Sequence, residues 1–124
     1  DWSVNILDKT IQNMDLSNQQ KLFIVGPKDF GEIKIKKFLN KTKNEKKIFK
    51  FNLEKDLLKI NDNLSKNTEN YEFINLIENI CERNLCPKFT EKGDLISYDG
   101  GHLTPEGAKF IYEKIKDKLE LNYD

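Results

Sequence analysis

Several features that define large protein classes are missing from this chain of 124 residues. No apolar run is long enough to cross a bilayer, and no segment has the pattern of a signal peptide. The 21 basic and 21 acidic residues balance, so the net positive charge typical of nucleic-acid-binding domains is missing. Histidine occurs once, which leaves too few imidazoles for most zinc sites. These absences argue against a membrane-spanning segment, a nucleic-acid partner and a metal centre.

The composition that remains is typical of one globular domain. Hydrophobic residues make up 37% of the chain, and its length suits a single core. The chain opens at Asp1 rather than Met and runs straight into an amphipathic segment. We therefore expect residues 1–124 to be a processed or excised piece of a longer polypeptide.

Hydrophobic periodicity predicts strands that alternate with helices. The predicted strands are 21–26, 48–53 and 71–76, and residues 95–98 are predicted to be a short extended piece. The predicted helices are 3–16, 30–40, 53 to about 61–63, and a last helix that Thr104 caps, with Pro105 in its first turn. This alternation predicts an α/β layer fold with a mainly parallel sheet, in which functional groups gather at the carboxyl ends of strands. We expect the loop after Gly26-Pro27 and the loop that holds His102 to share one rim.

The single histidine lies in the string YDGGHLTPEG, residues 98–107. An imidazole can accept and return a proton near neutral pH, and a nearby carboxylate can orient it. Asp99 precedes His102 by three residues, and the two glycines between them permit a tight turn. We interpret Asp99 and His102 as the candidate catalytic pair.

Two other groups of residues leave alternatives open. Cys81 and Cys86 are close enough in sequence for a disulfide, although a pair of reduced, partly buried thiols fits equally well. A zinc site that combines them with Asp99 and His102 fits the usual ligand spacing poorly. The lysine-rich stretch 34–50 is interpreted as a solvated surface rather than an anion-binding face, because the net charge of the chain is zero.

The catalytic string resembles the last conserved block of the SGNH hydrolase superfamily, also called GDSL hydrolases. In that block an Asp-x-x-His segment supplies two catalytic residues, matched here by Asp99-Gly-Gly-His102 and the following LTPEGA. The string is most similar to SGNH domains fused to membrane acyltransferases that modify cell-surface sugars, where His-Leu-Ser/Thr-x-x-Gly opens the final helix. The order of Trp2, the strand before Gly26-Pro27 and the cysteine pair agrees with the same domains.

The resemblance implies a fold and an activity. The fold is a three-layer αβα arrangement of the flavodoxin-like kind, and the activity is hydrolysis or transfer of acyl groups, without a cofactor. His102 is then the general base and Asp99 its orienter, while Phe30 lies at the rim near the substrate. The resemblance also implies a Cys81–Cys86 disulfide that pins the loop before the catalytic segment, outside the cytoplasm. The implied substrate is an acylated sugar or another small ester, and a membrane acyltransferase domain in the same polypeptide is the implied partner.

The chain departs from this family in one respect that decides its activity. The nucleophile of the family is the serine of a Gly-Asp-Ser block, which this sequence does not contain. Nor does it contain the Gly-x-Asn block of the oxyanion hole, and none of its serines lies in the expected context: Ser3, Ser17, Ser65 and Ser97. We therefore expect the carboxyl-terminal part of an SGNH domain, inactive alone. The alternatives are a non-catalytic α/β carbohydrate-binding domain and a flavodoxin-like domain of unrelated function.

Overall fold

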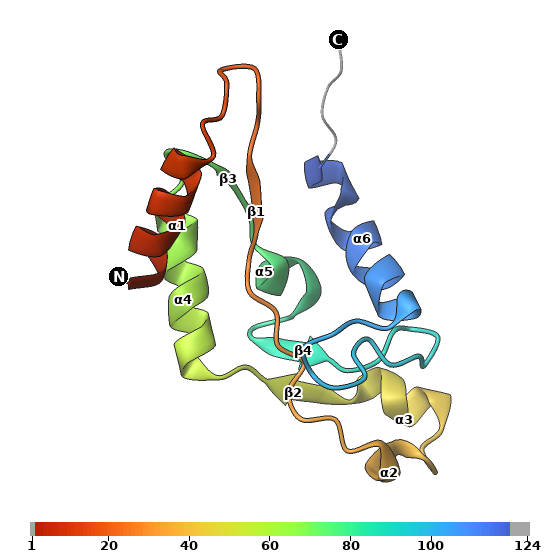
Figure 1. Ribbon diagram of the computed structural model, residues 1–124. Coiled ribbons are helices and arrows are strands. Elements are labelled where there is room, and N and C mark those ends of the chain that lie inside the picture. Colours follow the sequence, from red (N-terminus) through yellow and green to blue (C-terminus); the bar gives the residue numbers. More distant parts are fainter. Residues whose placement is uncertain (1, 120–124) are drawn as a thin grey trace.

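The computed structural model describes residues 2–119, which form a small α/β protein (Figure 1). The helices are α1 (Trp2–Asn13), α2 (Ile35–Phe38), α3 (Lys43–Ile48), α4 (Lys55–Lys66), α5 (Leu76–Ile80) and α6 (Pro105–Leu119). The strands are β1 (Phe23–Val25), β2 (Lys50–Asn52), β3 (Glu72–Ile74) and β4 (Leu85–Pro87). None of these helices is long and apolar enough to cross a membrane.

The strands form two separate pairs. β1 and β3 pair in parallel, with Ile24 opposite Phe73, whereas β2 and β4 pair antiparallel, with Phe51 opposite Cys86. The predicted mainly parallel sheet is therefore present within residues 2–119 only as the β1–β3 pair. β4 was not predicted, and its pairing with β2 makes half of the strand content antiparallel.

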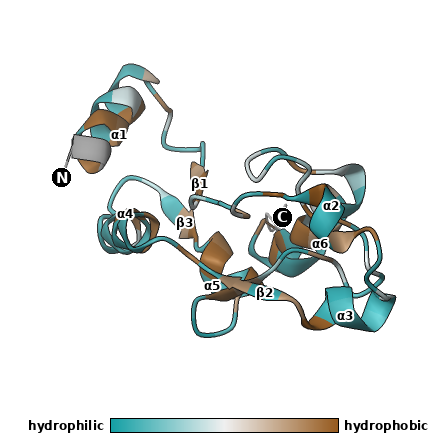
Figure 2. Ribbon diagram, turned by 90° about the horizontal axis from the view of Figure 1, so that it is seen from below, coloured by the Kyte–Doolittle hydropathy of each residue, from teal (hydrophilic) through white to brown (hydrophobic). Residues whose placement is uncertain are grey.

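Helices cover both sides of the parallel pair. Figures 1 and 2 show α1 and α4 on one side of β1 and β3, and α6 on the other. The main core is made of buried apolar side chains from β3 and from the loops and helices around this pair: Phe30, Ile74, Leu76, Ile96, Ile111 and Ile115. A smaller cluster of Leu53, Ile77 and Cys86 lies under β4.

The predicted elements agree with the structure best where the hydrophobic period is long. The amino-terminal helix, the strands around residues 24, 51 and 73, and the helix from Pro105 are all confirmed. The predicted helix 30–40 is confirmed only over the four residues of α2, and the lysine-rich stretch after them forms α3. Gly31 has a φ of 64°, and its N–H is bound by the Asp29 carboxylate, so a turn interrupts the helix.

The short piece predicted to be extended, residues 95–98, does not become a strand of either sheet. Leu95 and Ser97 form only isolated bridges, to Phe89 and Leu103 respectively. The backbone of Ile96 is instead shared between two partners, because its N–H binds the Lys88 carbonyl and its carbonyl accepts from the Thr104 N–H. The segment is extended, but it packs against the start of α6 rather than joining a sheet.

Candidate active site

Asp99 and His102 form a hydrogen-bonded pair in the loop before α6. The distance from His102 Nδ1 to Asp99 Oδ2 is 2.6 Å. Because an ionised carboxylate can only accept, Nδ1 carries the hydrogen and Nε2 keeps its lone pair. The His102 side chain is 76% exposed and that of Asp99 is 43% exposed, so the imidazole is open to an incoming group. This is the orientation and tautomer that a general base requires.

The Asp99 carboxylate also organises the turn that carries the histidine. Its Oδ1 accepts from the backbone N–H groups of Gly101 and His102, at 2.9 and 2.7 Å. The His102 backbone N–H, then the imidazole, and then the Gly101 N–H hold the pKa of Asp99 well below its usual range. Asp99 is therefore ionised throughout the neutral pH range and can stabilise an imidazolium.

Ser97 fixes the backbone of the loop that carries His102. Its side chain is fully buried, and its Oγ donates to the His102 carbonyl at 2.6 Å while accepting from the Gly100 N–H at 2.8 Å. Both hydrogen-bonding capacities of the hydroxyl are thus directed to the backbone. Across residues 4–119 no serine hydroxyl bonds to the imidazole ring, so Ser97 is a positioning residue and the pair has no nucleophile of its own there.

The loop after β1 is bonded to the catalytic loop, as predicted from the shared rim. The Phe30 N–H donates to the Gly100 carbonyl at 2.9 Å, and the Lys28 Nζ donates to the Gly101 carbonyl. Gly100 has a φ of 95°, and a Cβ at this residue would lie 2.4 Å from the Gly31 carbonyl oxygen. Only glycine allows the two loops to approach so closely.

The start of α6 supports the other end of the catalytic loop. Thr104 caps the helix as predicted, because its Oγ1 accepts from the Gly107 N–H at 2.9 Å. A Cβ on Gly107 would lie 1.9 Å from the Ile96 carbonyl oxygen. The helix therefore packs backbone to backbone against residues 95–97, and His102 lies between two fixed segments.

An aromatic ring restrains the imidazole directly. The rings of Tyr98 and His102 are stacked, with centroids 5.9 Å apart and an interplanar angle of 16°. Stacking on one face and the Asp99 bond at Nδ1 leave the imidazole little freedom to rotate. The orientation of the Nε2 lone pair is therefore fixed as well.

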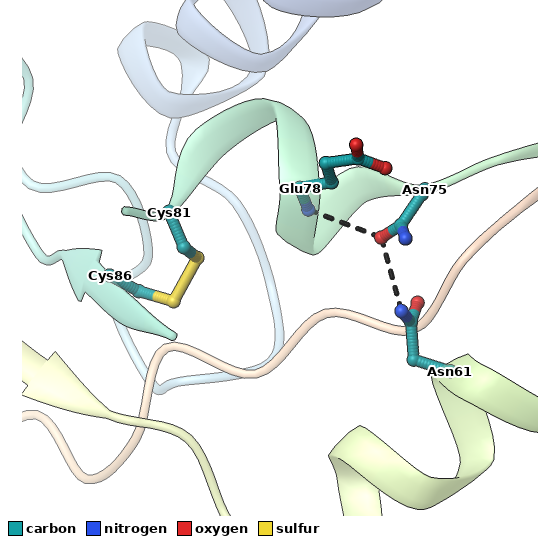
Figure 3. The surroundings of a disulfide bond; sticks show 5 residues. All are labelled: Asn61, Asn75, Glu78, Cys81 and Cys86. Carbon is teal, nitrogen blue, oxygen red and sulfur yellow. Dashed lines mark hydrogen bonds between the residues drawn. A yellow bond between two sulfur atoms is a disulfide. The ribbon is translucent and has the colours of Figure 1, made fainter. Parts of the chain in front are cut away.

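The remaining predicted site residues lie outside this pair. Phe30 is 1% exposed and packs in the main core, so its ring supports the loop and only its backbone reaches the catalytic turn. Cys81 and Cys86 are joined in a disulfide, with Cα atoms 4.3 Å apart (Figure 3). The bond closes a tight hairpin whose two turn residues, Arg83 and Asn84, both have positive φ. Within the described part of the chain, no group of three or more His, Cys, Asp or Glu side chains is placed to hold a metal ion.

Three residues of the site were not singled out by the sequence. Lys28 and Ser97 hold the loop that carries His102 through backbone carbonyls, and Tyr98 stacks on the His102 ring. The only available signal was the position of Ser97 and Tyr98 directly before Asp99. Their roles depend on how two distant loops meet, which local spacing does not encode.

Comparisons with known proteins add no relative: no protein-family model matches the chain, and none of the curated proteins or solved structures is significantly similar to it.

Proposed function

We propose that this chain is the carboxyl-terminal part of a serine esterase or O-acyltransferase domain that acts on acetyl esters of cell-surface carbohydrates. The observation that carries the proposal is the Asp99–His102 pair, with its 2.6 Å bond, its open imidazole and its rigid supports. The resemblance of residues 99–108 to the last SGNH block supplies the substrate class. The nucleophilic serine comes from polypeptide outside residues 1–124.

The mechanism is acyl transfer through a covalent intermediate. His102 Nε2 takes the proton of the serine hydroxyl as its oxygen attacks the ester carbonyl, and Asp99 stabilises the imidazolium. The tetrahedral intermediate then breaks its bond to the alcohol, which leaves with the proton from His102. Water or a sugar hydroxyl next gives its proton to His102 and attacks the acyl-enzyme. The bond to the serine oxygen then breaks as His102 returns the proton to that oxygen, which releases either the acid or a new ester and restores the serine.

The same proposal completes the fold as a three-layer αβα domain. Only one edge of β1 is paired within residues 2–119, and Val25 on this strand is 47% exposed. Parallel sheets are normally covered on both faces and contain more than two strands. Further parallel strands on the free edge of β1 would extend the sheet between the helices that already lie on its two sides, and would bring the serine block toward the same rim.

An extracytoplasmic location is part of the proposal. Its support is the Cys81–Cys86 bond, because disulfides persist in oxidising compartments and are rare in the cytosol. An acyltransferase domain in the membrane, encoded in the same polypeptide, would place the catalytic pair at the cell surface.

The decisive experiment uses the full-length protein. Its coding sequence must contain a Gly-Asp-Ser block before Asp1; without one, the catalytic proposal fails. With the block present, His102→Ala should lower kcat/KM for a small acetyl ester by about 10³-fold or more. Asp99→Asn should lower kcat by about 10²–10⁴-fold, since the correct tautomer is no longer held.

A matched control keeps this test specific. Asp62 is another exposed aspartate in an ion pair, with Lys66 on α4, so Asp62→Asn should leave turnover unchanged. His102 is largely exposed, so loss of activity in His102→Ala cannot be ascribed to unfolding if its circular dichroism spectrum is native. Retained turnover in that variant would refute the assigned base.

A non-catalytic carbohydrate-binding domain is the second candidate. It is favoured by one observation, that the described serines offer no hydroxyl to His102. Titration calorimetry of the full-length protein with acetylated sugars distinguishes the two: binding without turnover supports the second candidate, and hydrolysis or transfer supports the first.

A further inference from the structure

A basic surface surrounds α2 and α3, at the end of the molecule opposite α1 (Figures 1 and 2). We call it the α2–α3 surface and define it as the exposed side chains of residues 34–50. Eight lysines and one glutamate lie in these seventeen positions, although the whole chain has a net charge of zero. Six of the lysines are exposed and two, Lys41 and Lys46, are half-buried; the exposed ones are Lys34, Lys36, Lys37, Lys43, Lys47 and Lys50.

Aliphatic side chains are exposed among these lysines. Leu39 at 70% and Ile48 at 75% are the most exposed large apolar side chains of the described residues, and Ile35 is also exposed. Single exposed apolar residues are common and need no explanation. Three of them in one short basic segment are typical of a binding surface rather than of a surface that contacts only water.

The two helices are held together, so these side chains belong to one region. The Phe38 ring packs edge-to-face on Phe49 and on Phe89, with centroids 5.0 and 4.9 Å apart. Leu39 and Ile48 are the direct chain neighbours of Phe38 and Phe49, so both lie next to this aromatic contact. The capping box of Thr42 and Glu45 fixes the turn between the helices. The lysines and aliphatic side chains are therefore presented on a structured support.

We propose that the α2–α3 surface docks on an anionic lipid bilayer. The lysines bind headgroup phosphates, and Leu39, Ile48 and Ile35 enter the boundary between headgroups and acyl chains. A nucleic acid would use the lysines but would leave these aliphatic side chains in water, which is why lipid fits better. The proposal rests on the surface alone and not on the proposed catalytic function.

Docking has a consequence for the candidate active site. The segment that leads from β1 to α2 is bonded to the catalytic loop through the Phe30 N–H and the Gly100 carbonyl. A bilayer bound to α2 and α3 would therefore hold this end of the molecule, with the Asp99–His102 pair, close to the lipid surface.

The test is co-sedimentation of the protein with vesicles. Vesicles of phosphatidylcholine with about one-third phosphatidylglycerol should bind it, and pure phosphatidylcholine vesicles should not; binding should weaken as salt rises. The double variant K36Q/K47Q should lower the partition coefficient by about 25-fold, or about fivefold for each lysine. The double variant L39S/I48S should lower it by about tenfold. Control variant K109Q/K118Q removes two exposed lysines of α6 and should change it less than twofold.

Two outcomes would overturn the proposal. One is that phosphatidylglycerol vesicles fail to bind the folded wild-type protein at low salt. The other is that L39S/I48S binds these vesicles as tightly as the wild type, while single-stranded DNA or heparin also binds and competes. That result would assign the surface to a polyanion instead. All substituted side chains are exposed, so circular dichroism should confirm that each variant remains folded.

Discussion

At the scale of single residues, the Asp99 side chain both shapes the backbone of the loop and orients His102. One carboxylate oxygen closes the turn by accepting two backbone N–H groups, and the other orients the imidazole of His102. The same bonds that fix the geometry also keep the carboxyl ionised, because each of them stabilises its charged form. The geometry and the charge of the Asp99–His102 pair are therefore set by one side chain.

The lowered pKa of Asp99 predicts a contribution to stability that is lost in acid. Because the folded pKa lies below the unfolded value of about 3.9, the contribution is fully present above that value and is lost as pH falls toward the folded pKa. Between pH 5 and pH 2 the melting temperature of the wild type should therefore fall more than that of Asp99→Asn. Thermal melts followed by circular dichroism measure both. Equal losses in the two proteins would show that folding does not shift the Asp99 pKa.

At the scale of elements, prediction from sequence succeeded where a long hydrophobic period met a clear cap. The start of α6 is the example, since Thr104 and Pro105 mark it unambiguously. Prediction failed where a distant residue decided the local conformation. The Lys88 Nζ donates to the Glu32 carbonyl, and the Asp29 carboxylate accepts from the Gly31 N–H. These two bonds keep residues 29–32 in a turn, although the hydrophobic periodicity of the segment is that of a helix.

In the candidate site, too, local features could be predicted from the sequence and long-range contacts could not. Asp99 and His102 could be identified because they lie three residues apart in one loop. The supports from Lys28 and Ser97 depend on tertiary contacts, and β4 could not be predicted because its partner β2 is separated from it by α4, β3 and α5.

The close packing of α6 predicts an unusual response to a helix-favouring substitution. Alanine is normally more stable than glycine inside a helix by about 1 kcal/mol. At Gly107, however, the added Cβ meets the Ile96 carbonyl, so Gly107→Ala should destabilise the protein by about 1–3 kcal/mol. Urea unfolding measures this, with Lys109→Ala at an exposed α6 position as a nearly neutral control. A more stable Gly107→Ala variant would mean that α6 does not contact residues 95–97 as described.

At the scale of the whole molecule, the parallel sheet of residues 2–119 is limited to one pair of strands. Helices lie on both sides of a parallel pair that has only two strands, and the apolar strand β1 has one edge without a partner in the described chain. Such an edge presents unpaired backbone groups beside exposed apolar surface, which favours pairing with another strand. In the proposed complete domain, the next strand of the sheet would pair with this edge of β1.

This edge predicts how the 124-residue chain behaves alone in solution. It should self-associate with increasing concentration, because β1 of one molecule offers its free backbone groups and the exposed Val25 to another. Val25→Lys places a charge on the edge and should shift the sedimentation profile toward monomer without lowering the melting temperature. Tyr112→Lys, which changes an exposed apolar residue of α6, should leave association as in the wild type. If Val25→Lys associates as strongly as the wild type, the β1 edge is not the contact, and the argument for further strands at that edge loses its support.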